Sequence, residues 1–279
     1  MKNQKYMKVY LEITNICNRN CSFCPGTKRA KRRMSFEEFS AVVKQLEGMT
    51  EYLYFHLMGE PLTHPELPRF IEYASALDFK CAITTNGTLL DTRGDEILNS
   101  KPYKVNISLH SFEKGEENDY YKYLATVCEF ANKASSQGIL TVLRLWNKGY
   151  DGGMNDTTLN YLESALDGEW KWGARGARIR HKLHLEYGDR FDWPDMEAEN
   201  MGCSLFCYGL RDHFGVLCDG SVIPCCLDRE GAITLGNIFD TPIRDILSSE
   251  RALRILHGFD NRTAVEELCQ KCGYARRFG

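Results

Sequence analysis

The chain has 279 residues, of which 43% are apolar and 26% charged, a composition typical of a folded globular protein. Its formal net charge of −3 gives no electrostatic basis for a nucleic-acid or membrane partner, so we expect neither. The N-terminus lacks the apolar core of a signal peptide and no apolar run reaches transmembrane length, which predicts a cytoplasmic location. Twelve cysteines in a reducing compartment favour metal ligation over disulfides, and hence an anaerobic host.

A short apolar strand at residues 9–13 leads directly into Cys17, Cys21 and Cys24. The carboxyl ends of strands are where α/β folds keep their reactive groups. Iron–sulfur clusters are normally held by four cysteines, so three in one loop leave one iron open to another ligand. Taken alone, the loop is also compatible with a zinc knuckle or with buried free thiols. The basic run at residues 28–33 is expected to be a solvated loop rather than a contact for an anionic partner.

Strands and helices then alternate along the chain. Ser35 and Glu38 form a capping-box pattern at the start of a helix, and each later strand ends at a polar motif. The expected strands cover residues 52–57, 80–85, 103–110, 139–147 and 177–186, and the expected helices follow near residues 36–46, 67–77, 89–98, 120–138 and 159–166. Six such units predict an α/β fold, a parallel sheet curled into a partial (β/α)6 barrel of TIM type over residues 1–190.

The remaining segment, residues 191–279, is rich in cysteine and reads as a small second domain. Asp219-Gly220 predicts a two-residue β-hairpin, and a helix is expected to begin near Pro242. Cys207 and Cys225 lie on either side of the hairpin, and Cys269 and Cys272 form a C-x2-C pair. Cys203 and Cys226 could each replace a neighbouring ligand. Four cysteines with a C-x2-C half also suit a structural zinc site.

Two cysteine patterns and two short motifs resemble those of the radical S-adenosylmethionine (radical SAM) enzymes. Cys17-x3-Cys21-x2-Cys24, with aromatic Phe23 before the third cysteine, resembles the signature of that superfamily. Gly59-Glu60-Pro61 and Thr85-Asn86-Gly87 resemble its later motifs. Cys207-x12-Gly220-x4-Cys225 resembles the start of a SPASM domain, here in the shorter twitch form because no further cysteines follow Cys272.

The resemblance implies two iron–sulfur clusters and one cofactor. Cys17, Cys21 and Cys24 would hold a [4Fe-4S] cluster whose open iron binds S-adenosylmethionine (SAM), and Cys207, Cys225, Cys269 and Cys272 would hold one auxiliary [4Fe-4S] cluster. The residues expected near the cofactor are Phe23, Gly59, Glu60, Pro61, Thr85, Asn86, Ser108 and Arg144. Arg144 is the one charge in an apolar strand, and a structural acidic partner would explain it equally well.

The implied activity is reductive cleavage of SAM to a 5′-deoxyadenosyl radical that abstracts hydrogen from a small-molecule or peptide substrate. The electron would come from a donor such as flavodoxin or ferredoxin. An auxiliary cluster closed by four thiolates cannot bind substrate and would move an electron, which favours a dehydrogenase-like oxidation. That reaction needs a base, and nothing selects among His184, Glu186, Asp212, His213 and Asp228.

Two other functions remain open from the sequence. One is maturation of a ribosomally made peptide by thioether or carbon–carbon crosslinking. The early position of Cys17 predicts no separate N-terminal peptide-recognition domain, which counts mildly against it. The other is a non-catalytic iron–sulfur or zinc scaffold, in which Gly59, Glu60 and Asn86 would not matter for cofactor binding.

Overall fold

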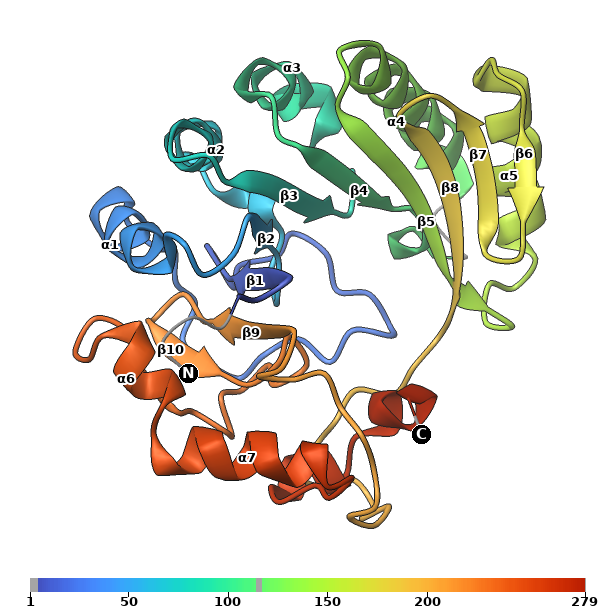
Figure 1. Cartoon of the computed structure of the whole chain (residues 1–279). Helices are drawn as coiled ribbons and strands as arrows, with labels where there is room; N and C mark the ends of the chain where they lie inside the picture. Colours follow the sequence, from blue (N-terminus) through green and yellow to red (C-terminus); the bar gives the residue numbers. More distant parts are fainter. Residues whose placement is uncertain (1–4, 114–116, 279) are drawn as a thin grey trace.

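An eleven-stranded sheet runs through the computed structural model, which describes residues 5–113 and 117–278. Its strands lie in the order β11-β10-β9-β1-β2-β3-β4-β5-β8-β7-β6, and the sheet curves into an open arc in Figure 1. The strands are β1 (Lys8–Leu11), β2 (Tyr52–Phe55), β3 (Lys80–Thr85), β4 (Lys104–Ser108), β5 (Leu140–Lys148), β6 (Lys171–Gly173), β7 (Gly176–Arg180), β8 (Leu183–Asp189), β9 (His213–Val216), β10 (Ser221–Ile223) and β11 (Gly236–Asn237).

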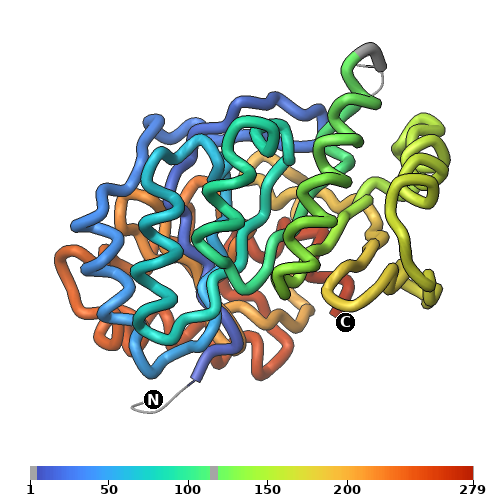
Figure 2. The backbone as a smooth tube through the Cα atoms, turned by 90° about the horizontal axis from the view of Figure 1, so that it is seen from above, coloured from blue at the N-terminus to red at the C-terminus, as the bar shows by residue number. Residues whose placement is uncertain are grey.

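Six central strands, β1 to β5 and β8, run parallel, as the predicted partial barrel requires. The connecting helices are α1 (Phe36–Leu46), α2 (Leu67–Ala76), α3 (Leu90–Ser100), α4 (Glu117–Ser136) and α5 (Met154–Ala165). Figure 1 shows α1 to α4 outside the arc, and Figure 2 shows these helices side by side when viewed from above. The expected α/β class and barrel are therefore confirmed.

Side chains along the central strands alternate between two environments. Val9 and Leu11 of β1 are fully buried in the core that the sheet forms with the outer helices. Because successive side chains of a strand point to opposite faces, Lys8 and Tyr10 point to the concave interior of the arc. The same alternation runs through β2, β4, β5 and β8. The interior therefore carries polar and charged side chains, while the outer face forms the apolar core.

Local signals account for several element boundaries. Ser35 caps α1, since its hydroxyl accepts from Glu38 N at 3.2 Å and Glu38 accepts in return from Ser35 N at 2.8 Å, as the capping box predicts. Cys81 and Cys128 are buried in the core, as expected of small apolar side chains. None of the helices within residues 5–113 and 117–278 is long and apolar enough to cross a membrane.

The C-terminal segment extends the same sheet. β9 pairs with β1 in parallel, with Lys8 opposite His213, and β10 and β11 continue the sheet in antiparallel fashion. The remaining elements are α6 (Ile243–Leu247), α7 (Glu250–Asp260), α8 (Glu267–Gln270) and the 3-10 helix η3 (Gly273–Phe278). The strand pairing fixes the cysteine-rich segment at one edge of the barrel.

Four local expectations need correction. The range 177–186 contains two strands, β7 and β8, which pair antiparallel, and only β8 joins the parallel barrel. The hairpin between β9 and β10 forms as predicted, but residues 217–220 make a four-residue loop. The helix expected from Pro242 is divided into α6 and α7, because Ser249 caps a new helix at Ala252 N. The basic run is a structural segment, since Arg29 pairs with the fully buried Glu12 at 2.7 Å.

Candidate active site

The cysteine loop after β1 is fixed by the loops that follow β3 and β4. Asn18 donates from Nδ2 to Thr88 Oγ1 at 2.8 Å and accepts at Oδ1 from Asn86 Nδ2 at 3.0 Å. Arg19 Nη2 donates to Ser111 O at 2.8 Å. Ser22 N donates to the carboxylate of Glu113 at 3.0 Å. These contacts place the loop over the carboxyl ends of the parallel strands, where the sequence predicts the reactive centre.

The three thiols of this loop are free and partly accessible. Cys17 is exposed, and Cys21 and Cys24 are half-buried. Burial raises the pKa of Cys21 to about 11, opposed by the positive charge of Arg19. Burial likewise raises the pKa of Cys17, and a backbone hydrogen bond from Arg19 opposes the shift. Binding of iron would therefore displace protons from these thiols.

Gly59 packs directly against the backbone that leads into the cysteine loop. Its φ of +80° lies in the left-handed region, and a Cβ atom would lie 2.4 Å from Thr14 O. The next residue, Glu60, donates from its backbone N to Ile16 O at 2.9 Å. The Gly-Glu-Pro motif predicts a close approach of the backbone to a neighbouring group. In this structure that group is the backbone of the chain itself. Pro61 opens the 3-10 helix η1 (Pro61–Thr63).

The Glu60 carboxylate connects the loops after β2 and β3. It is 2% exposed, and it accepts hydrogen bonds from Asn86 N at 2.7 Å and Leu62 N at 3.0 Å. Burial raises its pKa to about 7, although the backbone donors stabilise the charged form. Thr85 accepts from Gly87 N at 3.0 Å. The predicted cofactor residues Glu60, Thr85 and Asn86 therefore form one hydrogen-bonded unit beneath the cysteine loop.

Phe23 lies on the other side of the loop, beside the end of β4. Its ring centroid is 5.1 Å from that of His110, and both residues line a cavity of about 340 Å³ that also includes Trp146. The His110 ring accepts from Trp146 N at 3.3 Å, in keeping with a structural role. Ser108, at the end of β4, is half-buried and pairs in register with Arg144.

Arg144 points into the barrel and meets an acidic side chain. Its Nε lies 3.5 Å from Glu186 Oε2, and its guanidinium lies 4.5 Å above the ring of Trp146. Burial lowers its pKa, while Glu186 opposes that shift. The sequence left two explanations for Arg144, a cofactor carboxylate or a structural acidic residue. The structure shows the acidic residue, Glu186. Contact with the carboxylate of a cofactor remains a prediction.

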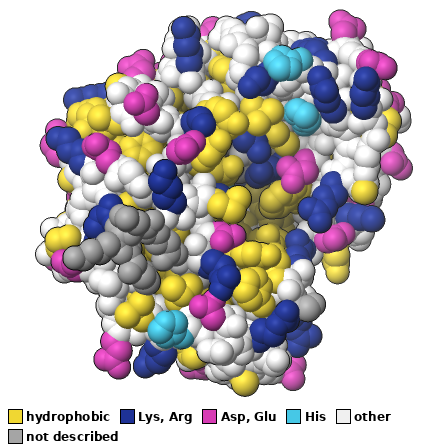
Figure 3. All heavy atoms as spheres, in the orientation of Figure 1, with side chains coloured by type: hydrophobic (Ala, Val, Ile, Leu, Met, Phe, Trp, Pro, Cys, Tyr) yellow, Lys and Arg dark blue, Asp and Glu magenta, His cyan; other side chains and the backbone are white. Residues whose placement is uncertain are grey.

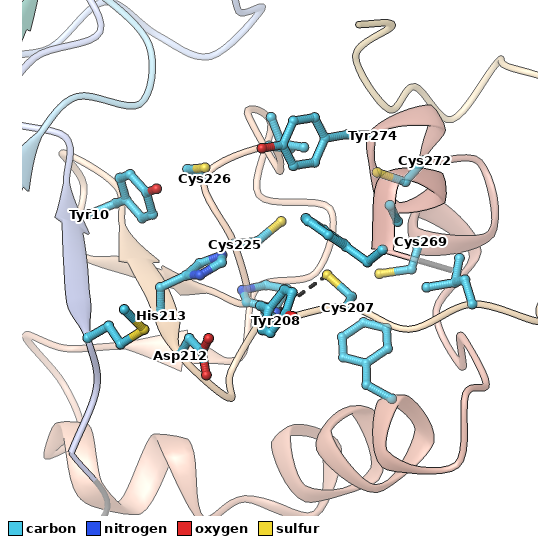
Figure 4. Close-up of a pocket in the computed structure, with 18 of the residues that line it drawn as sticks. Tyr10, Cys207, Tyr208, Asp212, His213, Cys225, Cys226, Cys269, Cys272 and Tyr274 are labelled. Atoms are coloured by element: carbon cyan, nitrogen blue, oxygen red, sulfur yellow. Dashed lines mark hydrogen bonds between the residues drawn. The ribbon is translucent and has the colours of Figure 1, made fainter. Parts of the chain in front are cut away.

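Five cysteines line a second cavity, of about 330 Å³, next to the hairpin. Cys207 precedes β9 and Cys225 follows β10, so the hairpin brings them to the same end, as predicted. Cys269 lies on α8 and Cys272 follows it. Figure 4 shows these four sulfur atoms directed toward a common space. The predicted auxiliary set is therefore gathered from three separate segments.

Burial dominates the electrostatics of this pocket. It raises the pKa of Cys207 to about 11, and it raises those of Cys225, Cys269 and Cys272 as well. Mutual repulsion between the sulfur atoms adds to the shifts of Cys225 and Cys269. Gly209 N donates to Cys207 Sγ at 3.4 Å. Thiols in so apolar a pocket stay protonated unless a metal replaces the proton.

The two alternative ligands differ in position. Cys203 is exposed and lies outside this cavity, whereas Cys226 lines it and packs against Tyr10. In Figure 4 Cys226 lies on the Tyr10 side of the pocket, between Tyr10 and Cys225. Cys218, on the hairpin, is buried and donates from its backbone N to Glu12 at 3.3 Å. We therefore keep Cys207, Cys225, Cys269 and Cys272 as the proposed ligands.

The residues present fit iron–sulfur clusters better than single ions. Among the residues that the structure describes, no three Cys, His, Asp or Glu side chains converge on a point where one metal ion could bind. A tetrahedral zinc site needs its sulfur ligands about 2.3 Å from one shared centre. A four-iron cluster binds each thiolate through a different iron, so its cysteines surround a wider space. The four auxiliary sulfur atoms face a shared space from different sides in Figure 4, as such a cluster requires.

The five candidate bases fall in three environments. His184 and Glu186 of β8 face the barrel interior, whereas Asp212 and His213 line the cysteine pocket. Burial lowers the pKa of His213 to about 4, so its imidazole is neutral at neutral pH. Asp228 accepts from Ala232 N and Ile233 N, both at 2.8 Å, which gives this carboxylate a structural role in a turn.

The polar side chains of the barrel interior were not predicted from the sequence. Lys8 and Lys104 lie on central strands and His56 directly follows β2, although parallel strands buried on both faces are expected to be almost entirely apolar. In several of these strands a polar residue recurs at every second position. That alternation could have identified the side chains that face the interior. Figure 3 shows the corresponding hollow, in which Lys or Arg side chains lie among hydrophobic ones.

Two family models match the chain. The radical SAM superfamily model matches residues 11–148, and the iron–sulfur cluster-binding SPASM model matches residues 207–273. The chain therefore belongs to the radical SAM superfamily and carries a C-terminal SPASM-type iron–sulfur domain. It is accordingly a radical SAM enzyme, and the predicted cofactors, SAM and iron–sulfur clusters at both sites, are confirmed at the level of these families.

Curated relatives share part of the chain. A GTP 3′,8-cyclase of Chlorobaculum tepidum is 32% identical over 111 residues, 38% of this chain and 33% of the cyclase. A GTP 3′,8-cyclase of Alkaliphilus oremlandii is 29% identical over 172 residues, 58% of this chain and 52% of the cyclase. An S-adenosylmethionine-dependent nucleotide dehydratase of Selenomonas ruminantium is 25% identical over 201 residues, 65% of this chain and 68% of the dehydratase. The match thus spans between a third and a half of the two cyclases.

Solved structures share the whole fold. BtrN in complex with AdoMet and 2-DOIA aligns with a TM-score of 0.59 at 18% identity, covering 97% of this chain and 94% of BtrN. The anSMEcpe enzyme with bound AdoMet and Cp18Cys peptide aligns with a TM-score of 0.61 at 16% identity, covering 97% of this chain and 87% of that enzyme. At these identities the likeness supports the fold.

Proposed function

We propose that this enzyme oxidises its substrate, using the auxiliary cluster as the electron acceptor. The observation that carries the proposal is the pocket in which Cys207, Cys225, Cys269 and Cys272 converge. Four thiolates complete the ligands of a four-iron cluster and leave no iron open to substrate. Such a cluster can transfer electrons but cannot bind the substrate directly. Cys17, Cys21 and Cys24, by contrast, supply only three ligands.

The proposed reaction divides between the two ends of the barrel. When bound at the cysteine loop, SAM and its cluster supply the 5′-deoxyadenosyl radical that removes a hydrogen atom from a substrate C–H bond. The auxiliary cluster, held by Cys207, Cys225, Cys269 and Cys272, would supply the acceptor for the remaining electron of the substrate radical, and a base of the chain would take the proton, so that the product would gain a double bond. The electron that starts the cycle comes from a donor such as flavodoxin or ferredoxin.

We place His213 first among the five candidate bases. It is the first residue of β9, faces the interior beside Tyr10 at 5.5 Å between ring centroids, and lines the cysteine pocket. Within the described part of the chain, its ring nitrogens have no hydrogen-bond partner. Glu186 pairs with Arg144, and the Asp228 carboxylate is held by two backbone N–H groups. A proton acceptor next to the electron acceptor suits the coupled loss of both.

Peptide modification is the second candidate. It is favoured by fold neighbours that were solved with peptides, namely anSMEcpe with the Cp18Cys peptide and SuiB of Streptococcus suis with its precursor peptide SuiA. The curated relatives favour a small molecule instead, because the cyclases and the dehydratase are named for nucleotide substrates. We therefore keep oxidation of a small molecule as the first proposal.

Electron paramagnetic resonance on the reduced, reconstituted enzyme tests the ligation on which this proposal rests. We expect two [4Fe-4S] signals, and added SAM should change only the one that a Cys17/Cys21/Cys24→Ala variant lacks. The auxiliary signal should be lost in a Cys269/Cys272→Ala variant and should not respond to SAM. An auxiliary signal that shifts when small thiols or amines are added would reveal an open iron and overturn the electron-transfer role.

A further inference from the structure

Three cationic side chains face the interior of the barrel from separate strands. Lys8 is the first residue of β1, Lys104 the first residue of β4, and Arg144 lies within β5. Each alternates with outward-facing core residues, so all three point to the concave side. Their charges act on one another, since Arg144 contributes to lowering the pKa of both lysines. The interior thus concentrates positive charge in a protein of net charge −3.

Two of these cations form no ion pair within the described part of the chain. Arg144 lies 3.5 Å from Glu186, but within residues 5–113 and 117–278 neither Lys8 nor Lys104 makes a side-chain hydrogen bond or ion pair. The Lys8 ammonium instead lies 5.3 Å from the ring centroid of Tyr10 and 5.2 Å from that of Tyr54. Both lysines are half-buried, and burial lowers the pKa of each. Asp212 acts to raise the pKa of Lys8 and Glu186 that of Lys104, but burial outweighs both, so each ammonium group is only partly compensated, which is costly to the fold.

His56 lies in the same interior, nearer the carboxyl ends of the strands, and is affected by the charges of all three cations. It points inward from the end of β2 and shares a hydrogen bond of 3.2 Å between Nδ1 and Thr84 Oγ1. Burial lowers its pKa to about 3, and the charges of Arg144, Lys8 and Lys104 all add to that shift. A neutral imidazole therefore lies within the field of three positive charges. An anion bound there would be stabilised by all of them.

We propose that Lys8 and Lys104, at the amino-terminal ends of their strands, bind a phosphate or similar oxyanion carried by the substrate. This inference rests on the proposed function and names the substrate class for the same interior site. Lysine ammonium groups bind phosphate as point charges, and low-dielectric walls strengthen the attraction. The two lysines begin their strands, whereas the SAM-binding loop lies at the carboxyl ends. The anionic group therefore sits on the barrel floor, away from SAM, and Lys8 places it beside the cysteine pocket.

Calorimetric titration of the reconstituted enzyme, saturated with SAM and held at constant ionic strength, tests the site directly. The probes are inorganic phosphate, pyrophosphate and acetate, which separate a phosphate group from a carboxylate. We expect phosphate or pyrophosphate to bind more tightly than acetate. Lys8→Gln and Lys104→Gln should each weaken that binding about tenfold, as expected for loss of one charged contact. Lys44→Gln, which removes an exposed lysine of α1, should leave the binding unchanged.

Each other outcome contradicts the inference in a distinct way. Equal weakening in Lys44→Gln would indicate non-specific attraction. Tighter binding of acetate would indicate a carboxylate substrate. Competition between SAM and phosphate would show that the cations serve the cofactor instead. Iron, sulfide and deoxyadenosine are measured on the same preparations, so a failure of cluster loading or SAM cleavage is recognised as a failure of the proposed function and not of the anion site.

Discussion

The cysteines of the loop after β1 lie within eight residues, whereas the auxiliary cysteines come from three segments between residues 207 and 272. Cys17 is exposed and its neighbours are half-buried, and the loop is held by polar contacts to Asn86, Ser111 and Glu113. The auxiliary thiols lie in an apolar pocket with Phe259 and Tyr274. The first site is fixed by local sequence and polar loops, and the second is fixed by the sheet and its hairpin.

The difference fits two distinct chemical tasks. A cluster that binds a cofactor needs an accessible position beside polar groups. A cluster that only passes electrons is better closed and shielded from water, because burial and full thiolate ligation set its potential. Glu12 connects the two regions. Its carboxylate contacts Arg29, in the basic run that follows the cysteine loop, and the backbone N of Cys218 on the hairpin.

Removal of the loop cysteines should have the largest effect. A Cys17/Cys21/Cys24→Ala variant should produce no deoxyadenosine above background, and its iron content should fall from about eight to about four per chain. Iron and sulfide assays and chromatography after addition of SAM and dithionite provide the measurement. Cys203→Ala, at an exposed position outside the pocket, is the matched control and should keep both clusters. Deoxyadenosine from the triple variant would contradict the assignment of the loop.

Arg29→Met should weaken the connection between the cysteine loop and the hairpin, because it removes the ion pair with Glu12. Glu12 is fully buried and accepts from Arg29 Nη2 at 2.7 Å and from Met58 N at 3.2 Å. Loss of the cation leaves a buried carboxylate unpaired, which should lower the free energy of unfolding by about 4 kcal/mol. Anaerobic urea titration measures this effect. The exposed Lys28→Met is the control, and adding Glu12→Gln to Arg29→Met should recover much of the loss. Similar losses for Lys28→Met and Arg29→Met would mean that the ion pair does not join the regions.

Gly59→Ala should disturb the support of the cysteine loop. The substitution places a methyl group 2.4 Å from Thr14 O, in addition to the strain of a φ of +80°. We expect a loss of about 3 kcal/mol in unfolding free energy and weaker SAM binding. Gly48→Ala is the matched control, because Gly48 has a φ of +73° and open space around its Cβ position. It should cost only about 1 kcal/mol. Equal costs would show that the contact with Thr14 has no effect.

His56→Gln should change the pH dependence of stability by a smaller amount. The pKa of His56 is lowered from 6.5 to about 3 in the folded chain, so the unfolded chain binds a proton first as the pH falls below 6.5. Wild type should lose stability between pH 6.5 and pH 3 for this reason, by at most about 2 kcal/mol at pH 5. Glutamine cannot titrate, so the variant should lose less between pH 7 and pH 5 in urea titrations. An identical slope for both proteins would contradict the buried neutral imidazole.

Much of the cofactor end could be predicted from the sequence. Because a motif follows each of three successive strands, the sequence predicted that Cys17, Gly59 and Asn86 lie at neighbouring strand ends. Hydrogen bonds join their loops in the structure. The basic run was misjudged because no local pattern shows that Glu12, seventeen residues before Arg29, is buried beside it. The sixth strand was assigned too broadly because β7 and β8 share one alternating pattern across a tight turn.

The sequence by itself determined the chemistry of the chain: three spaced cysteines after a strand, the motifs at later strand ends, and the alternation that builds the barrel. These signals are local, because periodicity and spacing act over a few residues. Only the tertiary structure decided which of the seven C-terminal cysteines share a pocket and that Lys8, Lys104 and Arg144 face one interior. Such groupings depend on strand pairing between residues far apart in the chain, which local patterns do not encode.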